Sequence, residues 1–424
     1  MSISRRQFNS LLLAGTSAIT APVSVTGQAK AKVVVIGGGA GGATAARYLA
    51  RDGKGELDVT LIESSVSYTS CFYSNLYIGG FRSFSSITHS YDSLASDYDI
   101  NIVQGYATEI DRDKQMVKLT DGSSIPFDRV LVAPGIDLIY DSVPGYSREA
   151  AEIAPHAWQA GPQTQLLKNR LDALEDGQQI IMIPPPNPYR CPPGPYERAS
   201  MMAHVIKAKG FKDSRISILD VKPKFSKQGL FTEGWSRKYP DIIEWIPPEI
   251  HGGILEVDAG AGIVETDIDT FEGALINVIP AMRAGAIAVN SGLTDDSGFC
   301  PVDGNSMRST FDNKVYVTGD ACIAGAMPKS GFSANSQAKV AVMNILGDLL
   351  GTKVTAASFA NVCWSLISTN NGVKVGAQYS ANARGEIVAD STFISQLGED
   401  DTIRQTTYQE SIGWYDSIIT DMLG

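Results

Sequence analysis

Residues 31–50, "AKVVVIGGGAGGATAARYLA", contain the motif that decides the fold. The apolar run from Val33 to Ile36 predicts a buried strand, and the alanine-rich run after the glycines predicts a helix. Between them, Gly37, Gly39 and Gly42 have the spacing of a dinucleotide-binding fingerprint. The first glycine of that fingerprint makes the turn, the second lets backbone approach a pyrophosphate, and the third lets the helix pack closely. The helix N-terminus then faces the phosphates.

A second predicted strand supports a bound dinucleotide. "LDVTLIE", residues 57–63, ends in Glu63, which is placed to bond a ribose hydroxyl. The alternative is a glycine-rich turn in some other α/β protein.

The bulk properties of the chain restrict its function classes. A length of 424 residues predicts two or three domains. The net charge of −11 argues against binding nucleic acid or an anionic membrane surface, and it allows a basic protein partner. The four histidines have no metal-ligand spacing, so we expect no metal site.

The first residues resemble a twin-arginine export signal. "SISRRQFNSLLLAGTSAITA" contains Arg5 and Arg6, followed by an apolar stretch from Leu11 to Ala21. That stretch is too short to span a bilayer, which takes about 20 apolar residues. A frayed basic tail would not need the apolar stretch. We therefore expect residues 1–31 to direct export to a bacterial periplasm, without membrane insertion.

Two later regions favour FAD over NAD at the first site. Residues 108–135 have an alternating hairpin pattern with a turn at Asp121–Gly122 and a strand ending in "APG". Residues 313–346 predict a strand, then Asp320, then a long helix from about Ser330. This order resembles the FAD domain of the disulfide-reductase-like flavoproteins, in which the strand-end Asp bonds the ribityl chain. The helix there points its N-terminus at the flavin pyrimidine ring. Lys329 either stabilises an anionic reduced flavin or is a surface charge.

A second βαβ unit lacks the glycines that a phosphate site needs. We expect a strand at 179–183, a loop at 184–196, a helix at 197–209 and a strand at 215–219. The loop reads "PPPNPYRCPPGPY", and each proline removes an N–H donor and fixes φ. The sequence therefore predicts that the chain does not use NAD(P)H.

Several long motifs carry a more specific resemblance. They are "VVVIGGGAGGATAARYL" (33–49), "SYTSCFYSN" (67–75), "PNPYRCPPGPYERAS" (186–200), "GFCPVD" (298–303), "GDACIAGAMPKSGFSANSQAK" (319–339) and "NVCWSLI" (361–367). Together with the signal, they resemble the flavoprotein subunit of flavocytochrome c sulfide dehydrogenase over essentially the whole mature sequence. The resemblance implies a periplasmic oxidoreductase that takes electrons from sulfide and passes them through FAD to a c-type cytochrome subunit, in a heterodimer. This chain has no CxxCH motif, so it carries no c-type haem of its own.

The same resemblance gives roles to three of the five cysteines. It implies that Cys71 is joined through sulfur to the 8α-methyl of FAD, although a lone buried cysteine is more often a small core hydrophobe. It also implies that Cys191, in the proline-rich loop, and Cys363, in a region with a helical pattern, form a redox-active disulfide. The alternative for this pair is a disulfide that only stabilises the fold. The family places an acidic residue near this site at the position of Glu197, which is either a base toward sulfide or an ordinary first-turn glutamate.

Cys300 and Cys322 lie in the returning part of the FAD domain, either as a structural disulfide or as two buried thiols.

The predicted fold class is α/β, an FAD/NAD(P)-binding Rossmann-like two-domain fold of the disulfide-reductase type with a C-terminal α+β domain. After the signal we expect an FAD domain split into residues 32–148 and 275–350. An NAD-like domain without an NAD site fills 149–274, and a C-terminal domain spans 351–424. Two other functions remain open: a sulfide:quinone oxidoreductase, and a non-catalytic FAD-binding scaffold. The acidic C-terminal tail lacks Lys and Arg, which suits membrane binding poorly.

Overall fold

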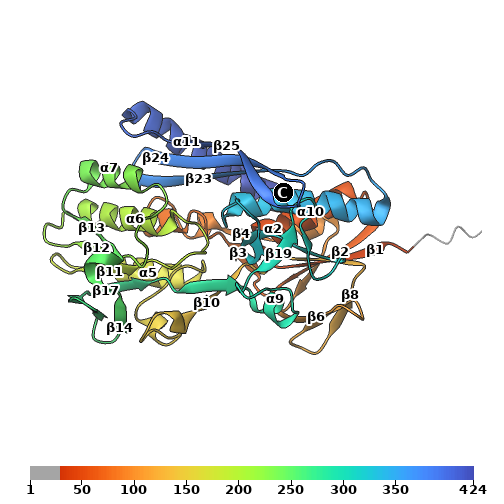
Figure 1. Ribbon diagram of the computed structural model, residues 1–424, viewed down its shortest axis with the longest axis horizontal. Coiled ribbons are helices and arrows are strands. Elements are labelled where there is room, and N and C mark those ends of the chain that lie inside the picture. Colours follow the sequence, from red (N-terminus) through yellow and green to blue (C-terminus); the bar gives the residue numbers. More distant parts are fainter. Residues whose placement is uncertain (1–28) are drawn as a thin grey trace, which may run out of the picture. The chain divides into compact units, whose positions relative to one another are not determined.

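The computed structural model describes residues 29–424 (Figure 1). The predicted export signal lies almost wholly outside the described residues, and it stays a prediction. No described helix is long and apolar enough to cross a membrane.

The largest sheet has eight strands in the order β22-β19-β20-β21-β9-β1-β2-β5. Its strands are β1 (Ala31–Ile36), β2 (Leu57–Glu63), β5 (Asn101–Gln104), β9 (Arg129–Val132), β19 (Cys300–Asp303), β20 (Arg308–Ser309), β21 (Val315–Val317) and β22 (Cys322–Ile323). The five strands from β21 to β5 run parallel, which explains why β1 and β9 are almost continuously apolar and buried. Since β9 pairs with β1 on one side and β21 on the other, two distant segments of the chain build one sheet. This confirms the predicted fold class.

Two helices of this domain pack against each other beside the sheet, α2 (Ala40–Asp52) and α10 (Gly331–Leu350) (Figure 1). The predicted hairpin region forms three antiparallel strands, β6 (Ala107–Asp111), β7 (Met116–Leu119) and β8 (Ser124–Pro126). Gly122 has φ +86° in the turn between β7 and β8, as the predicted turn requires. The smaller elements are β3 (Ser67–Thr69), α3 (Ser74–Ile78), β4 (Thr88–Ser90), α4 (Asp92–Tyr98), β10 (Ile136–Ile139), β18 (Ala281–Ala284) and α9 (Ala286–Asn290).

The central part of the chain forms a second parallel sheet, in the order β13-β12-β11-β17. The second βαβ unit is present, but its helix α6 begins at Gly194, three residues before the predicted start, because Pro195 is well tolerated in a first turn. The elements here are α5 (Pro162–Asp172), β11 (Ile180–Ile183), α6 (Gly194–Ala208), β12 (Ile216–Leu219), α7 (Gln228–Lys238), β13 (Ile243–Ile246), α8 (Pro248–His251), β14 (Ile254–Asp258), β15 (Ile263–Thr266), β16 (Thr270–Glu272) and β17 (Leu275–Val278).

The C-terminal part consists of an antiparallel sheet and one long helix. Its elements are β23 (Ser358–Ser368), β24 (Asn371–Ala381), β25 (Ile387–Ile394) and α11 (Asp401–Leu423). The predicted helical environment of Cys363 is therefore wrong, since Cys363 lies in strand β23 opposite Val375. The physical reason is a tight hairpin, in which Ser368 pairs with Asn371 and Asn370 adopts φ +55°.

Candidate active site

The glycine turn after β1 has the geometry that a dinucleotide requires. Gly37 has φ +94°, and a Cβ atom there would lie 2.3 Å from the carbonyl oxygen of Ala133. A Cβ atom on Gly42 would lie 1.7 Å from the carbonyl oxygen of Gly37, so only glycine lets α2 pack so closely. A Cβ atom on Gly39 would meet nothing within 4 Å, and no side chain caps the N-terminus of α2. The helix start is thus open to a phosphate group.

Glu63 lies at the carboxyl end of β2, beside this turn. Its carboxylate accepts hydrogen bonds from the N–H groups of Gly38 (2.6 Å) and Ser65 (2.9 Å). These two bonds fix the carboxylate at the mouth of the glycine turn, where the predicted ribose contact needs it.

Asp320 has an unsatisfied oxygen that fits a flavin cofactor. It lies in the short turn η4 (Gly319–Ala321) after β21, and its Oδ1 atom is buried without a hydrogen-bond partner. Its Oδ2 atom lies 3.7 Å from Nη1 of Arg190, and burial raises the pKa of the carboxyl group. A buried acceptor without a donor is costly, and a ribityl hydroxyl is a donor of the right kind. The residues present therefore fit FAD, with Gly37, Gly39, Gly42, Glu63 and Asp320 as the groups that would hold it.

Lys329 supports the Asp320 turn from within. Its Nζ atom donates to the carbonyl oxygens of Asp320 (2.9 Å) and Cys322 (2.8 Å), and it lies 3.7 Å from the ring centroid of Phe299. Burial lowers the pKa of its ammonium group. Lys329 is half-buried and is therefore not a simple surface charge, which was the alternative interpretation of its sequence.

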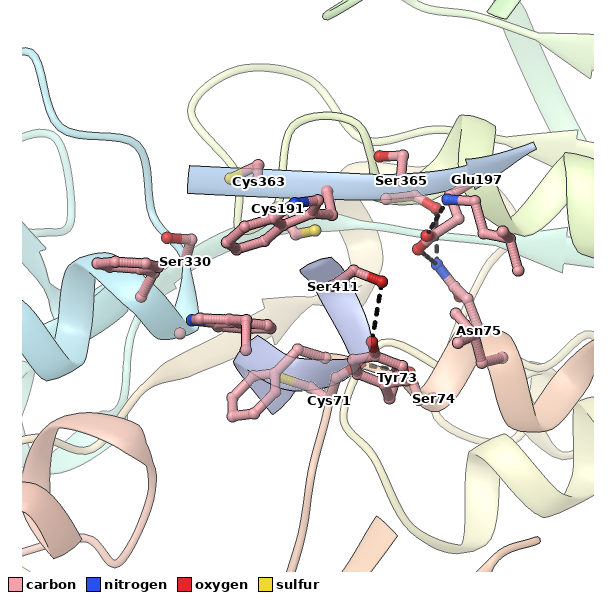
Figure 2. Close-up of a pocket in the computed structure, with 18 of the residues that line it drawn as sticks. Cys71, Tyr73, Ser74, Asn75, Cys191, Glu197, Ser330, Cys363, Ser365 and Ser411 are labelled. Atoms are coloured by element: carbon pink, nitrogen blue, oxygen red, sulfur yellow. Dashed lines mark hydrogen bonds between the residues drawn. The ribbon is translucent and has the colours of Figure 1, made fainter. Parts of the chain in front are cut away.

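One cavity of about 100 Å³ brings four of the predicted residues together (Figure 2). Cys191 and Cys363 lie on the side of strand β23, and Cys71 lies on the opposite side (Figure 2). Glu197 lines the same cavity, as do the first residues of α10 and the middle of α11. The glycine-turn residues, Glu63, Asp320 and Lys329 do not line it, although Arg190 links this cavity to Asp320.

The backbone of Cys191 is held in an unusual conformation. Its φ of +57° is rare for a residue with a side chain, and such strain is typical of functional sites. The N–H of Cys191 donates to the carbonyl oxygen of Lys329 (2.8 Å), and its own carbonyl accepts from the N–H of Gly194 (2.8 Å). The proline-rich loop thereby fixes the position of the Cys191 thiol.

All five cysteines are thiols in the structure, so the predicted disulfide between Cys191 and Cys363 stays a prediction. The two residues are close enough to interact electrostatically: burial raises the pKa of Cys191, and the proximity of Cys363 adds to that rise. The amide Nδ2 of Asn361 lies 3.4 Å from the sulfur of Cys363. The other open pair, Cys300 and Cys322, are register partners on β19 and β22, where burial raises each thiol pKa to about 12.

Glu197 differs from an ordinary first-turn glutamate, because its hydrogen bonds reach out of α6. One carboxylate oxygen accepts from the N–H of Leu366 on β23 (2.8 Å), and the other accepts from Nδ2 of Asn75 on α3 (2.9 Å) (Figure 2). Burial raises the pKa of the carboxyl group, while both hydrogen bonds oppose that rise. Its proposed role as a base stays a prediction.

Sequence reasoning missed two polar residues of this site, Asn75 and Lys227. Asn75 bonds Glu197 and also accepts from the buried guanidinium of Arg198 (3.1 Å). Lys227 donates to the backbone of Cys363 (3.0 Å). Asn75 is the last residue of the "SYTSCFYSN" motif, so its place in that motif could have marked it as a site residue. Lys227 lies in a lysine-rich loop, where no pattern distinguishes it from its neighbours.

The second nucleotide-type site is closed by its own side chains. Asp220 follows β12, where relatives that use nicotinamide cofactors have a ribose-binding acid, and it is fully buried. Its carboxylate accepts from Nζ of Lys222 (2.7 Å), the hydroxyl of Tyr196 (2.6 Å) and Nε1 of Trp245 (2.9 Å). Lys222 also donates to the carbonyl oxygen of Pro185 (2.7 Å), which ties the proline-rich loop down over the strand ends.

We therefore expect NADH and NADPH to leave the flavin oxidised. The proline-rich loop offers too few N–H donors for a pyrophosphate, and Asp220 has no free oxygen for a ribose. Anaerobic stopped-flow mixing with either nucleotide should show no bleaching, in a sample that sulfide then reduces. Rapid bleaching by NADH would contradict this account of the second site.

Comparisons with known proteins agree with this geometry. Residues 31–171 match the pyridine nucleotide-disulphide oxidoreductase model, residues 164–280 the central domain of the sulfide dehydrogenase [flavocytochrome c] flavoprotein chain, and residues 355–423 the flavocytochrome c sulphide dehydrogenase flavin-binding domain. The fold and the site define a flavoprotein oxidoreductase of the disulfide-reductase type. The central and C-terminal parts of the chain match the family of flavoprotein subunits of flavocytochrome c sulfide dehydrogenase.

Known relatives and structures point to a second, related group. The mitochondrial sulfide:quinone oxidoreductase of Dictyostelium discoideum is 23% identical over 342 residues, which are 76% of this chain and 71% of that protein. The Mus musculus protein of the same name is 22% identical, over 68% of this chain and 65% of its own length. The crystal structure of sulfide:quinone oxidoreductase from Aquifex aeolicus shares the fold, with a TM-score of 0.74, 16% identity and coverage of 93% and 92% of the two chains. Together these findings support sulfide oxidation by a flavoprotein.

Proposed function

We propose that this chain is the flavoprotein subunit of a periplasmic sulfide dehydrogenase, in which a disulfide between Cys191 and Cys363 receives sulfide. The observation that carries the proposal is the meeting of Cys191, Cys363 and Glu197 in one small cavity that Cys71 also lines.

The first step exchanges one sulfur–sulfur bond for another. Hydrogen sulfide gives a proton to Glu197, a carboxylate whose pKa burial raises, which makes it a stronger base than an exposed glutamate. The hydrosulfide ion attacks one sulfur of the disulfide, a new S–S bond forms and the old one breaks. The products are a cysteine persulfide and a cysteine thiolate, so charge and atoms balance. When bound, FAD supplies a two-electron acceptor for this reduced pair.

The residues around Cys71 support a covalent flavin. Cys71 lines the cavity opposite the sulfur pair, and the guanidinium of Arg190 opposes the burial that raises the pKa of its thiol. Arg190 also approaches Asp320, so one side chain links the two parts of the predicted FAD site. We propose the 8α-S-cysteinyl linkage at Cys71 on this basis and on the family resemblance.

We propose a c-type cytochrome subunit as the electron acceptor. A charge of −11 favours a basic partner, and this chain has no haem-attachment motif to pass on single electrons itself. The final helix α11 buries Tyr415, Ile418 and Met422 against the rest of the chain, which leaves those apolar side chains unavailable to a lipid surface. Quinone is a second candidate acceptor, because two relatives of the chain are named sulfide:quinone oxidoreductases.

An acceptor assay separates the two candidates. We expect that sulfide will bleach the flavin in an anaerobic titration, and that the reduced protein will pass electrons to added c-type cytochrome far faster than to a soluble quinone. The inverse preference would support the quinone-dependent function. A flavin that sulfide does not bleach would leave only the non-catalytic scaffold.

A further inference from the structure

Lys227 is a buried cation next to the sulfur pair, and nothing in the proposed chemistry yet uses it. It stands at the N-terminal boundary of α7, and only 7% of its surface is exposed. Its Nζ atom donates to the carbonyl oxygen of Cys363 (3.0 Å) and to the hydroxyl of Ser365 (2.8 Å). These bonds use two of its three N–H donors, and both are to neutral groups.

The charge of Lys227 needs compensation that these neutral partners do not supply. A buried ammonium is costly unless a negative charge lies near. The second buried lysine of this domain shows the usual solution, since Lys222 forms an ion pair with Asp220 at 2.7 Å. For Lys227 the negative groups in range are Cys363, Glu197 and Cys191. Two of these three become negative only when their sulfur is a thiolate.

We propose that Lys227 is a positioning residue whose ammonium group stabilises the thiolate form of the Cys191 and Cys363 pair. During turnover, hydrosulfide opens the disulfide and produces that thiolate, so this catalytic benefit of Lys227 rests on the proposed function. The effect of the Lys227 charge on ionisation of the two reduced thiols can be measured without sulfide.

The pH dependence follows from the groups that face Lys227. They are Cys363 and Ser365 on β23, Glu197 on α6, Cys191 in the proline-rich loop and the Phe231 ring on α7. Burial lowers the pKa of Lys227 to about 8, and the three acidic groups oppose that shift. Lys227 is therefore cationic below about pH 8 and neutral above it, so its support of the thiolate fades as the pH rises through that value.

Alkylation of the reduced protein tests the proposal directly. The flavin-loaded protein is reduced with dithiothreitol and treated with iodoacetamide from about pH 6 to about pH 10, which brackets the usual thiol pKa. The modification rates of Cys191 and Cys363 are read from their separate peptides by mass spectrometry. In Lys227→Met, alkylation of the more reactive thiol should be about tenfold slower below about pH 8, where the native lysine carries its charge, and the midpoint of the curve should rise.

Two further variants make the test specific. Lys224→Met removes an exposed lysine three residues away and should leave both alkylation curves unchanged. Lys227→Arg keeps the charge at all these pH values and should hold the midpoint at or below the native value. An unmoved midpoint in folded Lys227→Met would overturn the proposal. If that variant does not fold, a midpoint raised by about one unit in Lys227→Arg overturns it instead.

Sulfide assays then separate this inference from the function on which it rests. At each pH, the flavin-reduction rate of the variant is divided by that of the native protein. Sulfide is ionised to the same extent in both samples, so its own pH dependence drops out of this ratio. For Lys227→Arg this ratio should rise above about pH 8, where the native lysine loses its charge. If the alkylation midpoints shift as expected but sulfide never bleaches the native flavin, the role of Lys227 stands and the proposed function fails.

Discussion

Replacement of Cys191 or Cys363 by serine will leave FAD bound and will slow sulfide-dependent flavin reduction by at least about 1000-fold, the scale expected when a covalent participant is lost. FAD stays because the groups that fit it, among them Gly37 and Asp320, lie outside the cavity that holds the sulfur pair. The two single variants and the double variant should be about equally impaired, since two sulfurs that act as one unit do not give additive losses. Stopped-flow reduction by sulfide measures the effect.

A buried cysteine elsewhere provides the matched control. Cys300 is fully buried in β19 and does not line the cavity, so Cys300→Ser should keep most of the sulfide activity. Non-reducing peptide mapping of the air-oxidised protein should recover Cys191 joined to Cys363. Free thiols at both positions, or full activity in Cys191→Ser, would show that the proposed mechanism is wrong. The proline-rich loop would then only close the second nucleotide-type site.

Acid precipitation of the native protein will leave all of the yellow colour in the pellet, and Cys71→Ser will release all of it. A thioether bond to the flavin survives denaturation, whereas hydrogen bonds to Glu63 and Asp320 do not. A tryptic peptide that contains Cys71 should carry the mass of FAD. The serine variant should still bind FAD in its folded state, because the glycine turn and the unpaired oxygen of Asp320 remain.

A double change measures what the non-covalent site contributes. In the Cys71→Ser background, Asp320→Ala removes the buried acceptor and should weaken FAD binding by about tenfold or more, the value of one hydrogen bond to a charged group. Equilibrium dialysis gives the two dissociation constants. Complete release of flavin from the acid-treated native protein would exclude the covalent bond while leaving the FAD site intact.

The local motifs of this chain were readable from sequence because their chemistry depends on a few adjacent residues. Gly37 is required by its φ of +94° in the turn, Gly42 by the close approach of the Gly37 carbonyl oxygen, and Asp320 stands at the end of a single strand. The order of strands and helices around them follows from the same motifs. The fold class is therefore predictable from these motifs alone.

Long-range packing decided the features that the sequence did not disclose. Cys363 is in a strand because its partners come from residues 371–381 across a tight turn, and a run of apolar residues alone does not distinguish a helix from a doubly buried strand. Strand β23, from the C-terminal part of the chain, lies against α7 and accepts hydrogen bonds from the buried Lys227. The sequence around Lys227 is that of an exposed loop, and its chemistry comes from a neighbour 136 residues away.

The position of β9 between β1 and β21 also sets the order of events in biogenesis. On the ribosome, the glycine turn can form as soon as the first strands emerge, but the sheet cannot close on that side until residues 315–317 have been made. Asp320 arrives only after them, at a sequence distance that makes closure of the sheet a slow, non-local step. Completion of the flavin site is therefore a late event, because a nascent chain truncated before β21 lacks both the strand that closes the sheet and Asp320.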